Sequence, residues 1–301
     1  MVEYPMDRES KEHCLIVGGT GFVGTALVDE MLRLGWRVTV LSRTAGPAQS
    51  GCTRVQSLAA INTPVDAVVN LAGASLAGQR WSPRYKQEII DSRLDSLENI
   101  LDWIAQQPSP PKALVQASAI GYYGHQEGEL DERCGPGQGF SSELCQAIEA
   151  RLSSEPATTV IRLGVVLERA GGALPELAAT FRFGIASYLG DGQQMLSWIH
   201  RHDAVSAIIF LVSNQMTGVY NLTAPKPVSH RELTCALQKR FDTYLSVKVP
   251  GVLARALIGE MADDLLLNGQ TVLPRRLLRE GFRFTYPELD TALAAVYPAT
   301  R

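Results

Sequence analysis

One short segment, GGTGFVG at residues 18–24, constrains the fold of this chain more than any other. The run CLIV before it (14–17) is apolar throughout, as in a strand that is buried on both faces of a sheet. After it, apolar residues recur at helical spacing from 23 to 34, and a second apolar run, RVTVL, fills 37–41. A strand, a glycine turn, a helix and a strand in this order predict a βαβ unit that binds a dinucleotide. An ordinary tight turn is the alternative, and these flanking elements argue against it.

Each glycine of the turn has a physical role in this prediction. Gly18 permits the tight turn, Gly21 lets the backbone approach a pyrophosphate, and Gly24 lets the helix pack closely on the strand. The phosphates would meet the positive end of the helix. We therefore expect the cofactor to contact Gly18, Thr20, Gly21, Phe22, Val23 and Gly24.

The end of the second strand indicates which dinucleotide is bound. An NAD site usually places an acid there to bind both ribose hydroxyls, but residues 31–65 contain no Asp or Glu. Ser42 and Arg43 stand at this point instead. A hydroxyl and a guanidinium suit a 2′-phosphate, so we predict NADP(H) as the cofactor. The alternative is that Arg43 is an ordinary solvated surface residue.

Two further apolar runs extend the predicted sheet. DAVVNLAGA (66–74) ends in small residues, and Leu71, Ala72 and Gly73 would let the backbone lie close to a ligand. KALVQAS places Ser118 at the carboxyl end of a strand. Ligands bind at that edge of open α/β sheets, so these four residues are expected near the cofactor or substrate.

A long helix is predicted between these two strands. Ser82 and Pro83 form a good helix start, with a hydroxyl cap and a proline in the first turn, and the helix runs to about Gln106. Arg93 lies beside the apolar face of this helix rather than opposite it. This position makes it a candidate for pointing inward at a ligand.

Composition and charge exclude several other function classes. Hydrophobic residues make up 46% of the 301 residues, and the net charge is −3. No block of Lys and Arg appears, which argues against a nucleic-acid or membrane-surface partner. The start of the chain is polar, unlike a signal peptide, and the run AVSAIIFLV (204–212) is too short to span a bilayer.

The cysteine and histidine pattern points to reduced thiols and no metal. The five cysteines are scattered and form no CxxC motif, which indicates a cytoplasmic protein. The segment HRHD at 200–203 comes nearest to metal-ligand spacing, but it lacks a full ligand set. We expect no metal site.

Several specific blocks of the sequence resemble a known family. They include GGTGFVG, NLAGASL, QRWSPRYKQEIIDSRLDS, SAIGYYG, RLGVVL, SWIH and LPRRLLREGFRFTYPEL. With these blocks the chain resembles the extended short-chain dehydrogenase/reductases of the NAD(P)-dependent epimerase/dehydratase superfamily. It is more closely similar to an atypical subgroup designated "epimerase family protein", over residues 12 to 296.

The resemblance and the sequence pattern together predict an α/β fold with two parts. Residues 12–168 and 196–222 are expected to form a Rossmann-type NADP-binding domain with a doubly wound parallel sheet. Residues 169–195 and 223–301 are expected to form a smaller, discontinuous, mainly helical domain that acts as a lid. A pocket between the two is the expected substrate site.

The usual chemistry of the larger family needs four residues, and the resemblance implies that this chain keeps one of them. Ser141 stands for the tyrosine acid/base, Cys145 for the lysine four residues later, and Arg93 for a structural asparagine. Only Ser118 matches the family's upstream Ser or Thr. A serine hydroxyl has no accessible proton chemistry at neutral pH without a base beside it. A neutral thiol cannot supply the charge of an ammonium group.

Two tyrosines could replace the missing acid. Tyr122 and Tyr123 follow Ser118 in SAIGYYG, on a loop that points toward the nicotinamide in relatives. We therefore take these three residues as catalytic candidates. An aromatic pair that packs beneath the loop is the alternative.

Three other residues are expected at the cofactor rather than in the chemistry. Cys145 is expected to be an inert buried thiol beside the cofactor, and a nucleophile is the alternative. Arg93 is expected to bind a phosphate or ribose, because an arginine is no acid at neutral pH. Arg162 ends the apolar strand of TTVIRLGVVL and could approach the same site.

Two classes of function remain open from the sequence. The first is an NADP(H)-dependent oxidoreductase or epimerase-like enzyme that acts on a small carbonyl or nucleotide-sugar-like substrate. The second is a cofactor-holding sensor or scaffold without turnover. The complete dinucleotide motif and the large second domain favour the enzyme. The partner is expected to be a small molecule, and a homodimer stays open.

Overall fold

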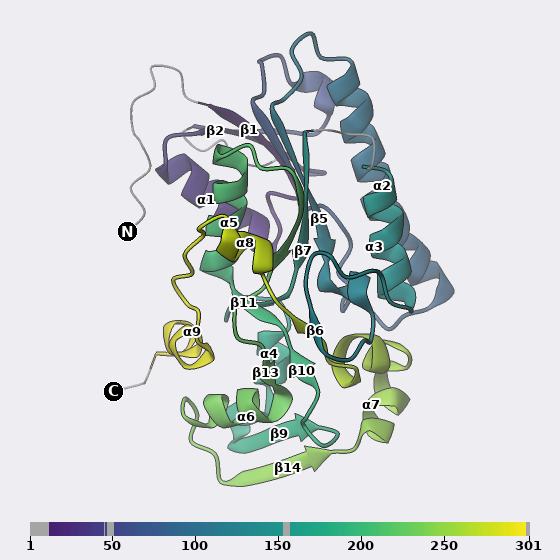
Figure 1. The fold of residues 1–301 in the computed structure, drawn as a ribbon, viewed down its shortest axis with the longest axis vertical. Coiled ribbons are helices and arrows are strands. Elements are labelled where there is room, and N and C mark those ends of the chain that lie inside the picture. Colours follow the sequence, from purple (N-terminus) through teal and green to yellow (C-terminus); the bar gives the residue numbers. More distant parts are fainter. Residues whose placement is uncertain (1–11, 45, 47–50, 153–156, 299–301) are drawn as a thin grey trace.

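A single sheet of seven parallel strands organises the computed structural model, which describes residues 12–298 apart from 45, 47–50 and 153–156. The strand order is β12-β7-β5-β4-β1-β2-β3 (Figure 1). The predicted α/β class with a doubly wound, Rossmann-type sheet is confirmed. The strands are β1 (His13–Val17), β2 (Arg37–Leu41), β3 (Cys52–Val55), β4 (Ala67–Asn70), β5 (Ala113–Ala119), β7 (Thr158–Leu163) and β12 (Gly218–Leu222).

Helices cover both faces of the sheet, as Figure 1 shows. One face carries α1 and α5, and the other carries α2 and α3. Alternate residues of β1 divide between these two layers: Ile16 packs with α1 and α5, whereas Leu15 packs with α2 and α3. The helices are α1 (Phe22–Arg33), α2 (Pro83–Ala105), α3 (Phe140–Ala150) and α5 (Arg201–Ser213).

The local signals of the sequence explain where these elements begin and end. The Ser82 hydroxyl accepts a hydrogen bond from the Tyr85 amide at 3.2 Å and caps α2, within a residue of the predicted start. Gly35, at φ +86°, follows the last turn of α1. The edge strand β3 was not predicted, because its half-exposed residues, CTRV, form no apolar run.

A smaller unit lies at the carboxyl edge of the sheet and has a core of its own. Helices predominate in it, but the parallel pair β9–β14 and the antiparallel pair β10–β13 add short sheets that the prediction did not include. Trp198, Phe181 and Leu293 are buried together in its core. The α-helices and strands outside the main sheet and its four helices are β6 (Glu129–Leu130), β8 (Val165–Leu167), α4 (Leu174–Leu177), β9 (Ile185–Leu189), β10 (Met195–Leu196), β11 (Trp198–His200), β13 (Val228–Ser229), α6 (His230–Gln238), β14 (Leu245–Val249), α7 (Gly251–Ile258), β15 (Thr271–Val272), α8 (Arg275–Arg279) and α9 (Leu289–Val296).

The predicted domain boundary at residue 223 assigned α8 to the smaller domain, but α8 packs elsewhere. Leu277 and Phe282 lie in the apolar layer that α1 and α5 form on the sheet. The Arg276 guanidinium donates hydrogen bonds to the carbonyls of Val219 and Thr217, each at 3.0 Å. The region around α8 therefore packs with the Rossmann sheet. A five-residue helix gives too short a pattern to show this in the sequence.

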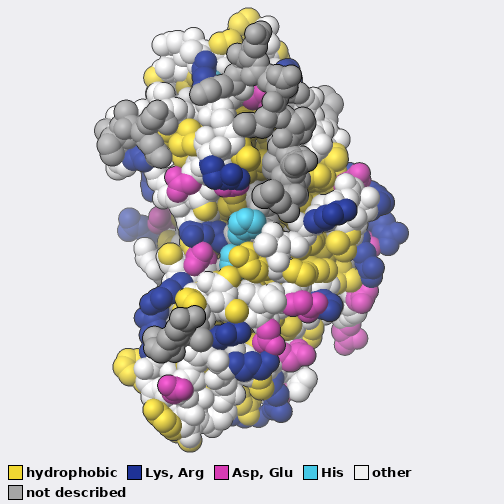
Figure 2. All heavy atoms as spheres, turned by 90° about the vertical axis from the view of Figure 1, so that its left-hand side faces the viewer, with side chains coloured by type: hydrophobic (Ala, Val, Ile, Leu, Met, Phe, Trp, Pro, Cys, Tyr) yellow, Lys and Arg dark blue, Asp and Glu magenta, His cyan; other side chains and the backbone are white. Residues whose placement is uncertain are grey.

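The surface seen in Figure 2 carries cationic and anionic side chains interspersed with one another. Within the part of the chain that the structure describes, no helix is long and apolar enough to cross a membrane. The longest helix, α2, has 23 residues but carries charged side chains along its length.

Candidate functional site

A cavity of about 360 Å³ lies where the carboxyl ends of β4, β5 and β7 meet the smaller unit. We call it the inner cavity. Its wall is mainly apolar and includes residues 71–73, 117–121, 163–165 and 195–197. The polar side chains in the wall are Arg93, Ser118, Ser141, Cys145, Ser197, Asp264, Asn268 and Gln270. Ligands of open α/β folds bind at this edge, so the inner cavity is the candidate site.

The glycine turn after β1 has the shape that a pyrophosphate requires. Gly18 has a φ of +82°, and a Cβ there would lie 2.8 Å from the carbonyl carbon of Leu71. A Cβ on Gly24 would lie 2.2 Å from the Gly18 oxygen. Helix α1 begins after Gly21 with no side-chain cap and no acidic residue in its first turn. Its terminal amides can therefore receive an anion without competition from a protein carboxylate.

The other residues of the turn have unequal access to a ligand. Thr20 is exposed, whereas Phe22 and Val23 are half-buried at the start of α1. A Cβ on Gly171 would come within 2.7 Å of the Phe22 ring, so that ring packs against the loop after β8. Phe22 is thus placed to contact a cofactor through its backbone.

Ser42 and Arg43 follow β2 as predicted, but they differ in their exposure and in their hydrogen bonds. Ser42 is buried and donates its hydroxyl proton to the carbonyl of Thr44 at 3.0 Å. Arg43 is exposed, and its side chain makes no ion pair within the described part of the chain. Its guanidinium is therefore available to an external phosphate, whereas Ser42 can only accept a hydrogen bond from a ligand.

Arg93 points into the inner cavity from α2. Its Nη1 donates to the carbonyl of Ile89 at 3.0 Å, and the guanidinium lies against Gly73, where a Cβ would be 2.7 Å from Cζ. Burial lowers the pKa of Arg93. No carboxylate among the described residues pairs with it, and a cation in this state favours an anionic or oxygen-rich ligand.

Ser118 lies in the cavity wall, and its hydroxyl proton is already used in a hydrogen bond within the protein. Its hydroxyl donates to Glu149 Oε1 at 2.8 Å, and Arg162 binds both oxygens of Glu149, at 3.0 Å from Nε and 2.6 Å from Nη2. An ionised carboxylate can only accept, so Ser118 must be the donor. It can therefore accept a hydrogen bond from a ligand but has no proton left to give it.

Arg162 does not approach the cavity as expected and lies behind Ser118 instead. It is 3% exposed and does not belong to the described cavity wall. Burial would lower the pKa of Arg162, but its hydrogen bonds and charge interaction with Glu149 outweigh burial and raise it. The pair fixes the Glu149 carboxylate, which in turn fixes Ser118.

The two tyrosines form the aromatic pair that the sequence left as an alternative. Tyr123 is fully buried, and its hydroxyl donates to Asn221 at 2.8 Å and accepts from Arg162 at 2.9 Å. Burial raises the pKa of Tyr123 to about 12. The Tyr122 ring stacks on the Arg162 guanidinium, 3.4 Å from its Cζ. Neither ring is among the described wall residues of the inner cavity, so the structure does not support either as a catalyst.

Cys145 and Ser141 do line the inner cavity, on α3. Burial raises the pKa of the Cys145 thiol, which donates to the carbonyl of Ala119 at 3.6 Å. This is the placement of an inert neutral thiol. Ser141 is 3% exposed, and within the described residues its Oγ has no hydrogen-bond partner. Its amide donates to Asp264 Oδ2 at 3.2 Å.

Asp264 is the site residue that sequence reasoning missed. It lies in a π-helical turn, Asp263–Leu267, and is the one acidic side chain in the described wall of the inner cavity. The segment DDLLL shows two adjacent acids but nothing that distinguishes one from the other. The contact with Ser141, 123 residues away, exists only in the folded chain.

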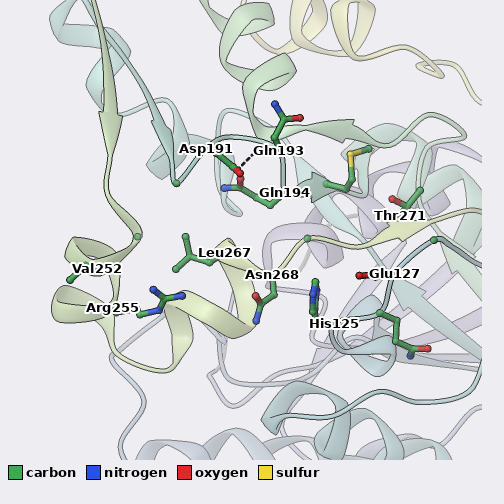
Figure 3. Close-up of a pocket in the computed structure, with 16 residues that line it drawn as sticks. His125, Glu127, Asp191, Gln193, Gln194, Val252, Arg255, Leu267, Asn268 and Thr271 are labelled. Atoms are coloured by element: carbon green, nitrogen blue, oxygen red, sulfur yellow. Dashed lines mark hydrogen bonds between the residues drawn. The ribbon is translucent and has the colours of Figure 1, made fainter.

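A second, polar pocket of about 630 Å³ adjoins the inner cavity (Figure 3). We call it the outer pocket. Met195 and Asn268 line both spaces. Figure 3 shows His125 beside Asn268, with Gln193 and Gln194 across the pocket. Within the described residues, no group of three or more His, Cys, Asp and Glu side chains could hold a metal ion.

Comparisons with known proteins agree with this geometry. Residues 14–223 match the model of the NAD dependent epimerase/dehydratase family. The chain belongs to the NAD-dependent epimerase/dehydratase family. Residues 249–296 match a separate model, described as a domain of unknown function (DUF1731), and this segment contains Asp264. The fold is that of an NAD(P)-binding, atypical short-chain dehydrogenase/reductase.

Relatives within the epimerase family match nearly the whole chain. Epimerase family protein ML0860 of Mycobacterium leprae is 36% identical over 300 residues, 95% of each chain. Human epimerase family protein SDR39U1 is 35% identical over 291 residues, 94% of this chain and 98% of the human one. The crystal structure of human SDR39U1 isoform 2 with NADPH has a TM-score of 0.87 and 33% identity, and covers 95% of this chain and 99% of that chain.

Proposed function

We propose that this epimerase-family chain binds NADP(H) and uses it to interconvert a small carbonyl compound and its alcohol in the inner cavity. The observation that carries this proposal is the cavity itself. It lies at the carboxyl edge of the sheet and is bordered by residues of the smaller unit. Among the residues that the structure describes, its wall holds Arg93 without a carboxylate partner, a fixed Ser118 and one carboxyl group.

Three features of the chain support cofactor binding. The uncapped start of α1 and Gly18 fit the pyrophosphate, and Arg43 is free to bind a 2′-phosphate. Arg93 and the backbone around Gly73 would contact the nicotinamide half. That the human relative was crystallised with NADPH supports the same cofactor here. A bound nicotinamide cofactor would supply or accept a hydride, and the protein must orient the substrate and supply a proton.

The charges of the two pockets favour a small neutral substrate over a nucleotide sugar. In the described walls, Arg93 and Arg255 are the only cations. Arg255 is already bound to Asp263, with Nη2 2.8 Å from Oδ1. Glu127 and Asp191 add negative charge to the outer pocket. A diphosphate would meet repulsion there, whereas amide side chains such as Gln193 and Asn268 suit hydroxyl and carbonyl groups.

Arg43→Ala is expected to weaken NADPH binding by about 10- to 100-fold and to leave NADH binding unchanged. A charge-assisted contact to the 2′-phosphate contributes about 1.5–3 kcal/mol, and NADH lacks that phosphate. Titration calorimetry with both cofactors measures the ratio. Arg133→Ala removes another exposed arginine and serves as the control. Equal affinities of the wild type for NADPH and NADH would overturn the predicted preference.

The proposed activity is tested by following NADPH oxidation with a panel of small aldehydes, ketones and nucleotide sugars. We expect slow turnover of at least one small carbonyl compound and none of the nucleotide sugars. Ser118→Ala should reduce that turnover, because Ser118 is the fixed acceptor in the cavity wall. Turnover of a nucleotide sugar would correct the substrate class.

A sensor or scaffold without turnover is the second candidate. The observation that favours it is the loss of the family's proton-transfer residues: Ser141 and Cys145 replace them, and Ser118 has its proton bound to Glu149. If the protein is such a sensor or scaffold, we expect it to bind NADPH tightly and to oxidise NADPH with no compound of the panel.

A further inference from the structure

The inner cavity needs a proton donor, and most of its polar groups cannot serve. Ser118 donates to Glu149, and the Cys145 thiol is neutral and buried. Arg93 keeps its proton at any pH the protein experiences. The phenol of Tyr123 is engaged outside the cavity wall. Among the described wall residues, Asp264 is the remaining group that can ionise in the working range of pH.

Asp264 is held at the amino-terminal end of α3. Its Oδ2 accepts the Ser141 amide at 3.2 Å, one bond of the several that a carboxyl group can make. Gly139, at φ +101°, caps the start of α3 beside this carboxyl group: a Cβ built on it would lie 3.5 Å from Oδ2, an ordinary contact distance. The helix start therefore stabilises the ionised form once the proton has left.

The π-helical turn separates Asp264 from its neighbour. The Asn268 amide donates to the carbonyl of Asp263 at 3.2 Å, five residues back. The Asp263 side chain pairs with Arg255 in the outer pocket, whereas Asp264 lines the inner cavity. Two adjacent acids thus have different surroundings, and Asp263 is the natural control for Asp264.

The segment that carries Asp264 is tied to the rest of the site. Ser197 Oγ donates to the carbonyl of Gln270 at 2.7 Å and accepts the Val272 amide at 2.8 Å. The Gln270 side chain donates to the carbonyl of Gly124 at 2.6 Å. These bonds hold residues 270–272, which follow the π-helical turn, against Ser197 before β11 and against the loop after β5.

We propose that Asp264 is the catalytic acid and base of the inner cavity and replaces the tyrosine at whose position Ser141 stands. The proposal rests on the proposed function. In the reductive direction the substrate carbon receives a hydride from reduced nicotinamide, and the C=O π bond breaks. The substrate oxygen takes the proton of Asp264, so one C–H and one O–H bond form. The cofactor is oxidised by two electrons, and Asp264 is left as a carboxylate that solvent reprotonates.

The surroundings of Asp264 set the direction of the pH dependence. Burial raises the pKa of Asp264, and the Ser141 amide opposes this. The charge of Glu260 raises the pKa of Asp264 further and that of Lys86 lowers it, and these two side chains pair with each other at 2.5 Å. Arg93 and Cys145 belong to the same wall. Because reduction needs the protonated acid, kcat/KM should fall as pH rises through the raised pKa of Asp264, and oxidation should show the opposite trend.

Asp264→Asn tests the assignment, because an asparagine can still accept the Ser141 amide but cannot transfer a proton. With the carbonyl compound that the wild type reduces fastest, kcat should fall by about 10²–10⁴-fold, the usual contribution of a general acid. The fall of kcat/KM with rising pH should disappear, and the affinity for NADPH should change less than threefold. Asp263→Asn should retain wild-type kcat. Loss of NADPH binding in Asp264→Asn, or equal losses in both variants, would make Asp264 a structural tether only.

A second measurement does not depend on turnover. Carbon-13 NMR of aspartate-labelled protein, compared with Asp264→Asn, identifies the Asp264 carboxyl signal. We expect it to titrate above the ordinary aspartate range and to shift when NADP⁺ binds. An active wild type whose Asp264→Asn variant keeps its kcat would overturn this proposal alone. A wild type that oxidises NADPH with no compound would overturn the proposed function, and the catalytic role of Asp264 with it.

Discussion

Glu149→Ala is expected to destabilise the fold by about 3–5 kcal/mol, the cost of removing one partner from a buried ion pair. Arg162 and Glu149 have side chains 4% and 12% exposed, and the carboxylate accepts three hydrogen bonds from Arg162 and Ser118. The variant would leave the Arg162 charge buried without an anion. Urea unfolding measures the change as a lower midpoint at unchanged slope.

The control for this prediction is an exposed ion pair between α2 and the end of α3. Glu98 pairs with Arg151 at 2.7 Å, but these side chains are 55% and 37% exposed. Exposed pairs contribute about 0–1 kcal/mol, so Glu98→Ala should change stability by no more than that. If Glu149→Ala and Glu98→Ala destabilise the protein equally, burial does not decide the strength of the Arg162 pair.

Gly24→Ala is expected to weaken NADPH binding by about 10- to 100-fold, because displacing α1 from the turn would lose a charge-assisted hydrogen bond to the pyrophosphate, which contributes about 1.5–3 kcal/mol. The added Cβ would lie 2.2 Å from the Gly18 oxygen and 2.8 Å from Gly19 Cα. Both contacts are backbone, so α1 must move away from the turn that binds the pyrophosphate. The same strain should lower stability by about 1–3 kcal/mol, as overpacking does.

Calorimetric titration with NADPH and thermal unfolding without cofactor separate these two effects. Gly135→Ala is the matched control, since a Cβ there meets nothing within 4 Å. Its NADPH affinity should stay within threefold of the wild type. Retention of wild-type affinity in Gly24→Ala would mean that the cofactor does not depend on the close packing of α1 on the turn.

The sequence predicted the Rossmann half of the protein well because its signals are local. The run CLIV is buried in β1 on both faces, and Gly18 and Gly24 stand where only glycine fits. The hydroxyl of Ser82 caps α2 within a few residues of itself. Apolar period, caps and turns act over a few residues, so they can be read from the chain directly.

Burial by distant elements was harder to predict. The sequence placed Arg162 and the phenol of Tyr123 at the end of a strand and in a loop near the site. It could not show that the two side chains would bond to each other, at 2.9 Å, and be covered away from the cavity. A strand pattern tells which residues are apolar, but the layer that covers a polar residue comes from elsewhere in the chain.

By itself, then, the sequence determined the parallel sheet, the dinucleotide turn, the missing carboxylate after β2 and the absence of the family's tyrosine and lysine. Only the tertiary structure decided which groups could act in their place. Glu149 accepts a hydrogen bond from the Ser118 hydroxyl, 31 residues away, and Asp264 accepts one from the Ser141 amide, 123 residues away. The protonation and reach of a side chain depend on its partners in space, and those partners are fixed by how α3 and the smaller unit pack against the sheet.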